Sequence, residues 1–112
     1  MKIRAKVVLS ILLFSSVFSK AEIDGYIQDV ERGDIKNALD SLSTLKQKYT
    51  DEPSLLYLEA ILMVDTKESI KLYKKLFKRY EDSEYADDAI MKIAEYYYTD
   101  GSYESSGVWL NK

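Results

Sequence analysis

The sequence predicts an all-α protein built from antiparallel helical hairpins. Between Glu22 and Lys112 there is one proline, and no stretch alternates apolar and polar residues as a strand would. Apolar side chains instead recur at steps of three and four, which places them on one face of a helix. The breaks between these segments are short and carry glycine, proline or a capping residue, so consecutive helices should pack antiparallel.

The first 21 residues are expected to be a cleaved export signal. Two lysines and an arginine lie within residues 2–6, residues 7–18 are mostly apolar, and small residues follow. The apolar stretch is shorter than the roughly 20 residues that a membrane-spanning helix needs. Cleavage after Ser19 and cleavage after Ala21 both fit the pattern, and the mature domain would span residues 22–112.

Composition narrows the functions that the chain could have. It contains no Cys and no His, so disulfides, the usual zinc sites and the commonest general base are not expected, and neither is a cofactor. No lipid anchor is expected, because bacterial lipoproteins need a Cys at their mature N-terminus. The net charge is −3 and becomes more negative without the basic signal segment, which argues against a nucleic-acid partner.

The first hairpin is expected to begin with a short helix over about residues 23–31. Gly33 should end this helix in a left-handed conformation, and Asp34 should cap the next one, which runs to about Tyr49. The apolar stripe of this second helix consists of Ile35, Ala38, Leu42, Leu45 and Tyr49.

The second hairpin is expected to contain the most buried helix. Pro53 suits the first turn of a helix, and residues 54–64 are apolar almost all round. Asp65 and Glu68 have the spacing of a capping box, which starts a fourth helix ending near Tyr80.

The third hairpin is expected to start near residue 83. Its first helix runs to about Tyr98, Gly101 turns the chain, and Ser102 is placed to cap a sixth helix over residues 103–112. Its apolar and small residues resemble those of the tetratricopeptide repeat, whose period is about 34 residues. The matching residues are Ile90, Ile93, Ala94 and Tyr97 in the first helix, Gly101 in the turn, and Tyr103, Ser106 and Leu110 in the second helix.

The resemblance divides the mature chain into repeats of about 22–50, 53–81 and 83–112, the last one incomplete. It implies a short α-solenoid of stacked hairpins. The first repeat matches mainly in its second helix. The middle repeat departs most, because its turn is about two residues short and Ile70 occupies the small position.

Two phrases, "LKQKYTDEPS" and "LFKRYEDSEYADDAIMKIAEYYYTDGSYESS", are similar to those of exported bacterial tetratricopeptide-repeat proteins. That branch includes outer-membrane assembly lipoproteins and the coordinator of the Tol and Pal system. The resemblance implies a non-catalytic scaffold in the periplasm or cell envelope that binds an envelope protein or peptide. The missing Cys departs from the lipoproteins and favours a soluble periplasmic relative, or a module followed by another domain.

The first helices of such repeats line a groove. Carried over to the third hairpin, the groove positions are Asp88, Met91, Glu95 and Tyr98. An aromatic residue and a methionine among acids would suit an extended peptide or a partner helix. A further repeat or a C-terminal helix could equally cover Tyr98, and self-association through the open third hairpin is a related expectation.

The sequence is also compatible with a different function. Repeats serving as a spacer ahead of a C-terminal peptidoglycan-binding domain are the main alternative. Catalysis is not expected, because the paired acids at residues 51–52 and 87–88 are sequence neighbours rather than two acids facing across a cleft. The basic run over residues 71–79 could contact an anionic surface, but such runs are more often solvated faces.

Overall fold

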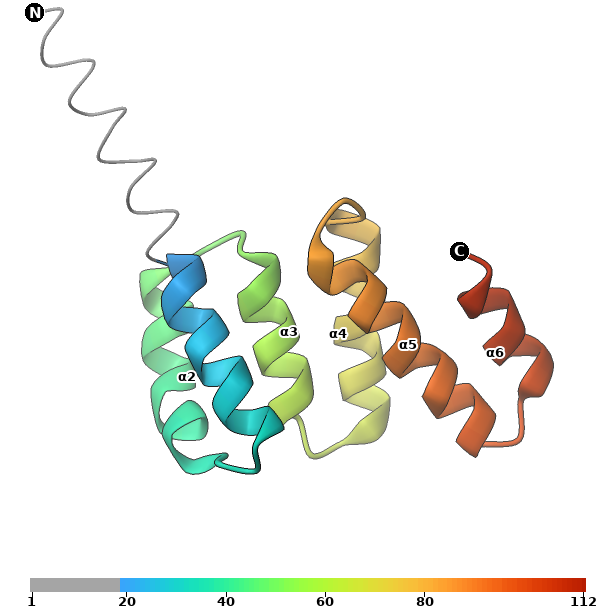
Figure 1. Cartoon of the computed structure of the whole chain (residues 1–112), viewed down its shortest axis with the longest axis horizontal. Coiled ribbons are helices and arrows are strands. Elements are labelled where there is room, and N and C mark those ends of the chain that lie inside the picture. Colours follow the sequence, from blue (N-terminus) through green and yellow to red (C-terminus); the bar gives the residue numbers. More distant parts are fainter. Residues whose placement is uncertain (1–18) are drawn as a thin grey trace, which may run out of the picture. The chain divides into compact units, whose positions relative to one another are not determined.

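The computed structural model describes residues 19–112, and this part of the chain is all-α without any strand (Figure 1). The predicted fold class is therefore confirmed. The expected export signal lies mostly outside the described residues, although its last three residues belong to the first helix. No helix in residues 19–112 has the length and apolar character needed to cross a membrane. The helices are residues 19–31, α2 (Lys36–Lys48), α3 (Pro53–Leu62), α4 (Thr66–Arg79), α5 (Glu84–Thr99) and α6 (Tyr103–Leu110).

The chain forms two compact units, one ending at Thr50 and one starting at Asp51. In the first unit, polar contacts link the helix of residues 19–31 to the end of α2. The Tyr49 hydroxyl and the Lys48 ammonium both donate to the Glu22 carboxylate. The hydrogen bond from Tyr49 is the main cause that lowers the pKa of Glu22 below its usual value.

The stripe predicted for α2 is only partly buried. Ala38 and Leu45 are buried, but Ile35 is 46% exposed because it occupies the N-cap, before the helix begins. The predicted cap by Asp34 was wrong, since no side chain caps α2.

Two glycines end helices in the left-handed conformation, as the sequence predicts. Gly33 has φ +94° and Gly101 has φ +84°. After α5, the Ser102 N–H donates to the Tyr97 carbonyl at 2.8 Å, and the Gly101 N–H donates to Tyr98 at 3.1 Å. This is the Schellman arrangement, and the same pair of bonds surrounds Gly33.

Replacing Gly101 by Ala should lower the free energy of unfolding by about 1–2 kcal/mol. The cost comes from the backbone, because a Cβ at this position would meet no atom within 4 Å. Gly107→Ala is the matched control: this site is equally open but lies within α6, so a gain of about 0.5–1 kcal/mol is expected. Urea denaturation compares the two variants. A Gly101→Ala protein as stable as wild type would contradict the left-handed turn.

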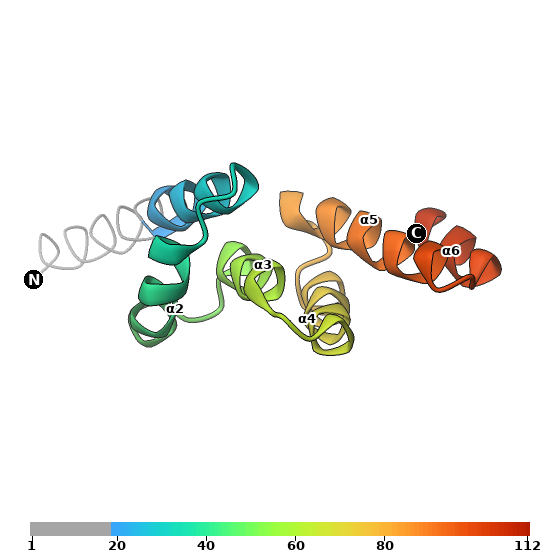
Figure 2. The same ribbon diagram turned by 90° about the horizontal axis from the view of Figure 1, so that it is seen from below.

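The second unit is a succession of packed helices. Helix α3 packs on α4, α4 on α5 and α5 on α6, and α3 also contacts α5 (Figure 2). Leu58, Leu76 and Ile93 are the largest fully buried side chains of this unit. Six of the ten residues of α3 are buried, as expected for the most buried helix.

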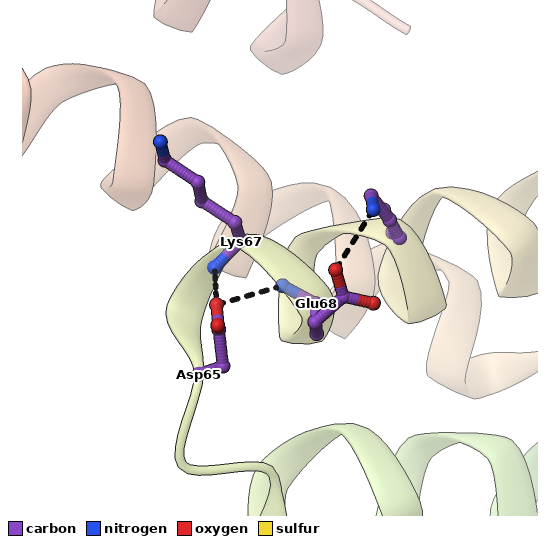
Figure 3. A network of polar contacts seen from close by, with 4 residues as sticks. Asp65, Lys67 and Glu68 are labelled. Carbon is purple, nitrogen blue, oxygen red and sulfur yellow. Dashed lines mark hydrogen bonds and ion pairs between the residues drawn. The ribbon is translucent and has the colours of Figure 1, made fainter.

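Helix α3 ends earlier than predicted. It stops at Leu62, Met63 is extended, and Val64 is 97% exposed. Asp65, the N-cap of α4, is also extended. The Asp65 carboxylate accepts from the N–H groups of Lys67 and Glu68 at 2.9 and 3.2 Å (Figure 3). The predicted cap by Asp65 is therefore present, and the extended backbone of this N-cap accounts for the break between α3 and α4. The Glu68 carboxylate, expected to complete a capping box, pairs instead with Lys71 at 2.8 Å.

The caps of α5 and α6 differ. Ser83 caps α5 by accepting a hydrogen bond from the N–H of Tyr85 at 3.2 Å. Ser102 occupies the N-cap of α6, but its side chain makes no capping hydrogen bond, so that prediction was wrong. Its ψ of 66° departs from the extended value usual at an N-cap.

Candidate functional site

Both hairpins of the second unit contain the same buried hydrogen bond. Ser106 Oγ on α6 donates to the carbonyl of Ala94 on α5 at 2.8 Å, and Ser69 Oγ on α4 donates to the carbonyl of Ala60 on α3 at 2.8 Å. The serine follows the alanine by 12 residues in one hairpin and by 9 in the other. The turn is thus three residues shorter in the earlier hairpin, and its small position is Ser69 rather than the predicted Ile70.

This shared bond defines equivalent positions in the two hairpins. Tyr57 and Met91 each lie three residues before the bonded alanine, and Tyr73 and Leu110 each lie four residues after the bonded serine. Their burial differs sharply. Tyr57 and Tyr73 are 5% and 4% exposed, whereas Met91 and Leu110 are 52% and 54% exposed.

The difference comes from the helix that comes next in the chain. The Tyr57 ring lies 5.9 Å from the Tyr73 ring and stacks at 5.0 Å on Tyr85, in the first turn of α5. The first helix of the next hairpin therefore covers this face of the α3–α4 hairpin. Among the described residues, no corresponding helix packs over Met91 and Leu110.

The uncovered face contains a hollow of about 220 Å³ between α5 and α6, which we call the α5–α6 hollow. Met91, Glu95 and Tyr98, three of the four predicted groove residues, line it. Asp88 is exposed on the same helix but does not line the hollow. The complete lining is Met91, Ala94, Glu95, Tyr98, Thr99, Ser106 and Leu110.

Aromatic rings extend the apolar surface at one end of the hollow. Tyr98 is 65% exposed, and its ring meets the ring of Tyr103 edge-on at 5.0 Å. Tyr103 is 63% exposed. Tyr103, Ser106 and Leu110 match repeat positions in the sequence but are not among the predicted groove residues. The Ala and Ser residues of the two hairpins were a signal in the sequence for the equivalent positions. Only the structure shows that these positions are buried in one hairpin and exposed in the other.

The basic run on α4 is largely engaged within the chain. Lys71 pairs with Glu68, Arg79 pairs with Asp51, and Lys74 donates to the Tyr97 hydroxyl at 2.7 Å. Lys74 also lies over the rings of Tyr97 and Trp109. Because these basic side chains already contact groups of the chain itself, the run is better explained as part of the folded surface than as a site for an anionic partner.

Tyr73 has a strongly displaced pKa. Burial raises its pKa to about 12, a hydrogen bond with Ser69 opposes the rise, and the Glu95 carboxylate adds to it. The same tyrosine is buried against Tyr57 beneath the helix that covers this face. Its ionisation therefore reports on the packing of the α3–α4 hairpin.

Stability should fall between pH 10 and 12 because of Tyr73. The unfolded chain releases this proton near pH 10 and the folded chain near pH 12, so the stabilisation is intact below pH 10 and is lost as the pH rises through 12. The loss should reach about 1.4 kcal/mol by pH 11. Urea denaturation of wild type and Tyr73→Phe from pH 8 to 11 measures it. Parallel loss of stability in both proteins would contradict the assignment.

The α5–α6 hollow is thus the candidate site of the second unit. In residues 19–112, no cluster of three or more potential metal-ligating side chains occurs. The chain matches no protein-family model, no curated protein and no solved structure.

Proposed function

We propose that this chain is a non-catalytic scaffold of the bacterial cell envelope that binds another envelope protein through the α5–α6 hollow. The observation that carries the proposal is the exposure of Met91 and Leu110 at positions where the preceding hairpin buries Tyr57 and Tyr73. The envelope location rests on the export signal expected from the sequence and on the resemblance to exported tetratricopeptide-repeat proteins.

The chemistry of the hollow suits a protein partner. Met91, Tyr98 and Leu110 are each more than half exposed and border one concave surface. Exposed apolar groups gathered in this way mark interaction sites on monomeric proteins. Methionine adapts its shape to a partner, and tyrosine adds a large rigid contact with a polar end.

Photo-crosslinking in the native bacterium tests the proposal. A photoreactive amino acid replaces Met91 in the full chain, and a second version carries it at Val64, which is apolar and 97% exposed but does not line the hollow. Irradiation should give a defined product from position 91, and mass spectrometry should identify an envelope protein in it.

The photoreactive residue at Val64 is the control, because crosslinks caused by random collision should form there as readily as at position 91. The identified protein, once purified, should bind the wild-type chain and bind the Leu110→Glu variant at least about tenfold more weakly, because the variant places a charge in an apolar contact. Equal crosslinking at the two positions, or a product containing no envelope protein, would refute the proposal.

A further inference from the structure

We infer that the occupant of the α5–α6 hollow is a basic amphipathic helix, seated where the first helix of a following hairpin would lie. The inference rests on the proposed function and specifies the partner's chemistry. It combines two observations, the way α5 covers the equivalent face of the preceding hairpin and the charge around the hollow.

Helix α5 provides the template for the shape of the occupant. It covers the α3–α4 hairpin with Tyr85 in its first turn, stacked on Tyr57. Ala86 and Ala89, which are 1% and 0% exposed, have small side chains that let α5 approach α4 closely. A helix with an aromatic residue in its first turn and small residues after it would meet Met91 and Leu110 in the same way.

The acidic residues around the hollow favour an occupant with positive charge. Glu95 lines the hollow, and Glu84, Asp87 and Asp88 are also exposed on α5, whereas Lys92 is the one basic residue of that helix. Opposite charges brought together in a partly desolvated contact attract more strongly than they do in open water. Lysine or arginine beside the apolar anchors of the occupant would therefore complement this surface.

The same charge argues against a second copy of the chain as the occupant. Two copies joined through equivalent faces would bring Glu95 and Asp88 of one close to the acidic residues of the other. Such like-charge contacts disfavour association. A partner with a basic helix avoids this repulsion, and its basic side chains are attracted by the same acidic residues.

Two synthetic peptides provide a matched test. One has the sequence of residues 82–99, and the other carries E84K, D87K, D88K and E95K, so both keep Tyr85, Ala86 and Ala89. Fluorescence anisotropy measures the binding of each labelled peptide to the full chain at low salt. The basic peptide should bind at least about tenfold more tightly than the acidic one, and added salt should reduce the difference.

Variants of the full chain then locate the binding. Met91→Lys should weaken binding of the basic peptide at least about tenfold, by placing a like charge in the hollow. Val64→Lys, which adds the same charge at a site 97% exposed, should leave the affinity within about twofold of wild type. Circular dichroism verifies that both variants remain helical.

Each other outcome overturns the inference. Equal binding of the two peptides would refute the role of charge, and binding unaffected by Met91→Lys would place the contact elsewhere. Self-association of the chain in sedimentation, lost in Met91→Lys, would make a second copy the occupant. If neither peptide binds but position 91 still crosslinks to an envelope protein, the helical occupant is refuted and the proposed function stands.

Discussion

Tyr57→Ala should lower the free energy of unfolding of the second unit by about 3–5 kcal/mol, the range for deleting a large buried aromatic side chain. Tyr57 is 5% exposed, and its ring contacts the rings of Tyr73 and Tyr85. The truncation leaves a cavity between three helices. Urea denaturation followed by the fluorescence of Trp109, the single tryptophan of the chain and a residue of α6, measures the loss in this unit.

Met91→Ala is the matched control, because Met91 holds the same position of the next hairpin. Its side chain is 52% exposed, so the expected loss is within about 1 kcal/mol. The two substitutions thus compare a position that a following helix covers with the equivalent position that is exposed. Similar losses in both variants would contradict the correspondence drawn from the two buried serine hydrogen bonds.

Leu76→Ala should cost about 2–5 kcal/mol by the same measurement. Leu76 is 0% exposed on α4, the helix that packs against both α3 and α5. A loss of this size is a large part of the roughly 5–15 kcal/mol that stabilises a typical domain. The variant should therefore unfold at a much lower urea concentration.

A truncation at the surface provides the comparison for Leu76. Val64→Ala removes apolar atoms from a side chain that is 97% exposed, and the expected change is within about 0.5 kcal/mol. A Leu76→Ala protein that lost less than this surface variant would show that α4 is not central to the packing of the second unit.

The sequence was sufficient to predict the helices, because their apolar spacing and helix-ending residues are local signals. Pro53, Asp65 and Ser83 begin helices and Gly33 and Gly101 end them, as expected. The error at the end of α3 arose because two local preferences compete there. Val64 is apolar enough for a buried helix, but the capping geometry at Asp65 takes residues 63–64 out of α3.

The candidate site was predictable only along one helix. Met91, Glu95 and Tyr98 succeed one another at steps of four and three, so helical periodicity places them on one face of α5. Their relation to Leu110 depends on how α6 packs. Coverage of that face depends on whether another helix packs against the α5–α6 hairpin. Helical periodicity carries no information about the packing of α6 or of such a helix.

The methyl signals of the methionines test the central claim most directly. The chain contains Met1, Met63 and Met91, so labelling the methionine methyl groups gives a few resolved NMR signals. Met91 lines the α5–α6 hollow, whereas Met63, 36% exposed at the end of α3, does not. When purified crosslinked partner is added, the Met91 signal should shift or broaden while the Met63 signal stays unchanged. An unchanged Met91 signal at saturating partner would contradict the assignment of this hollow as the docking surface.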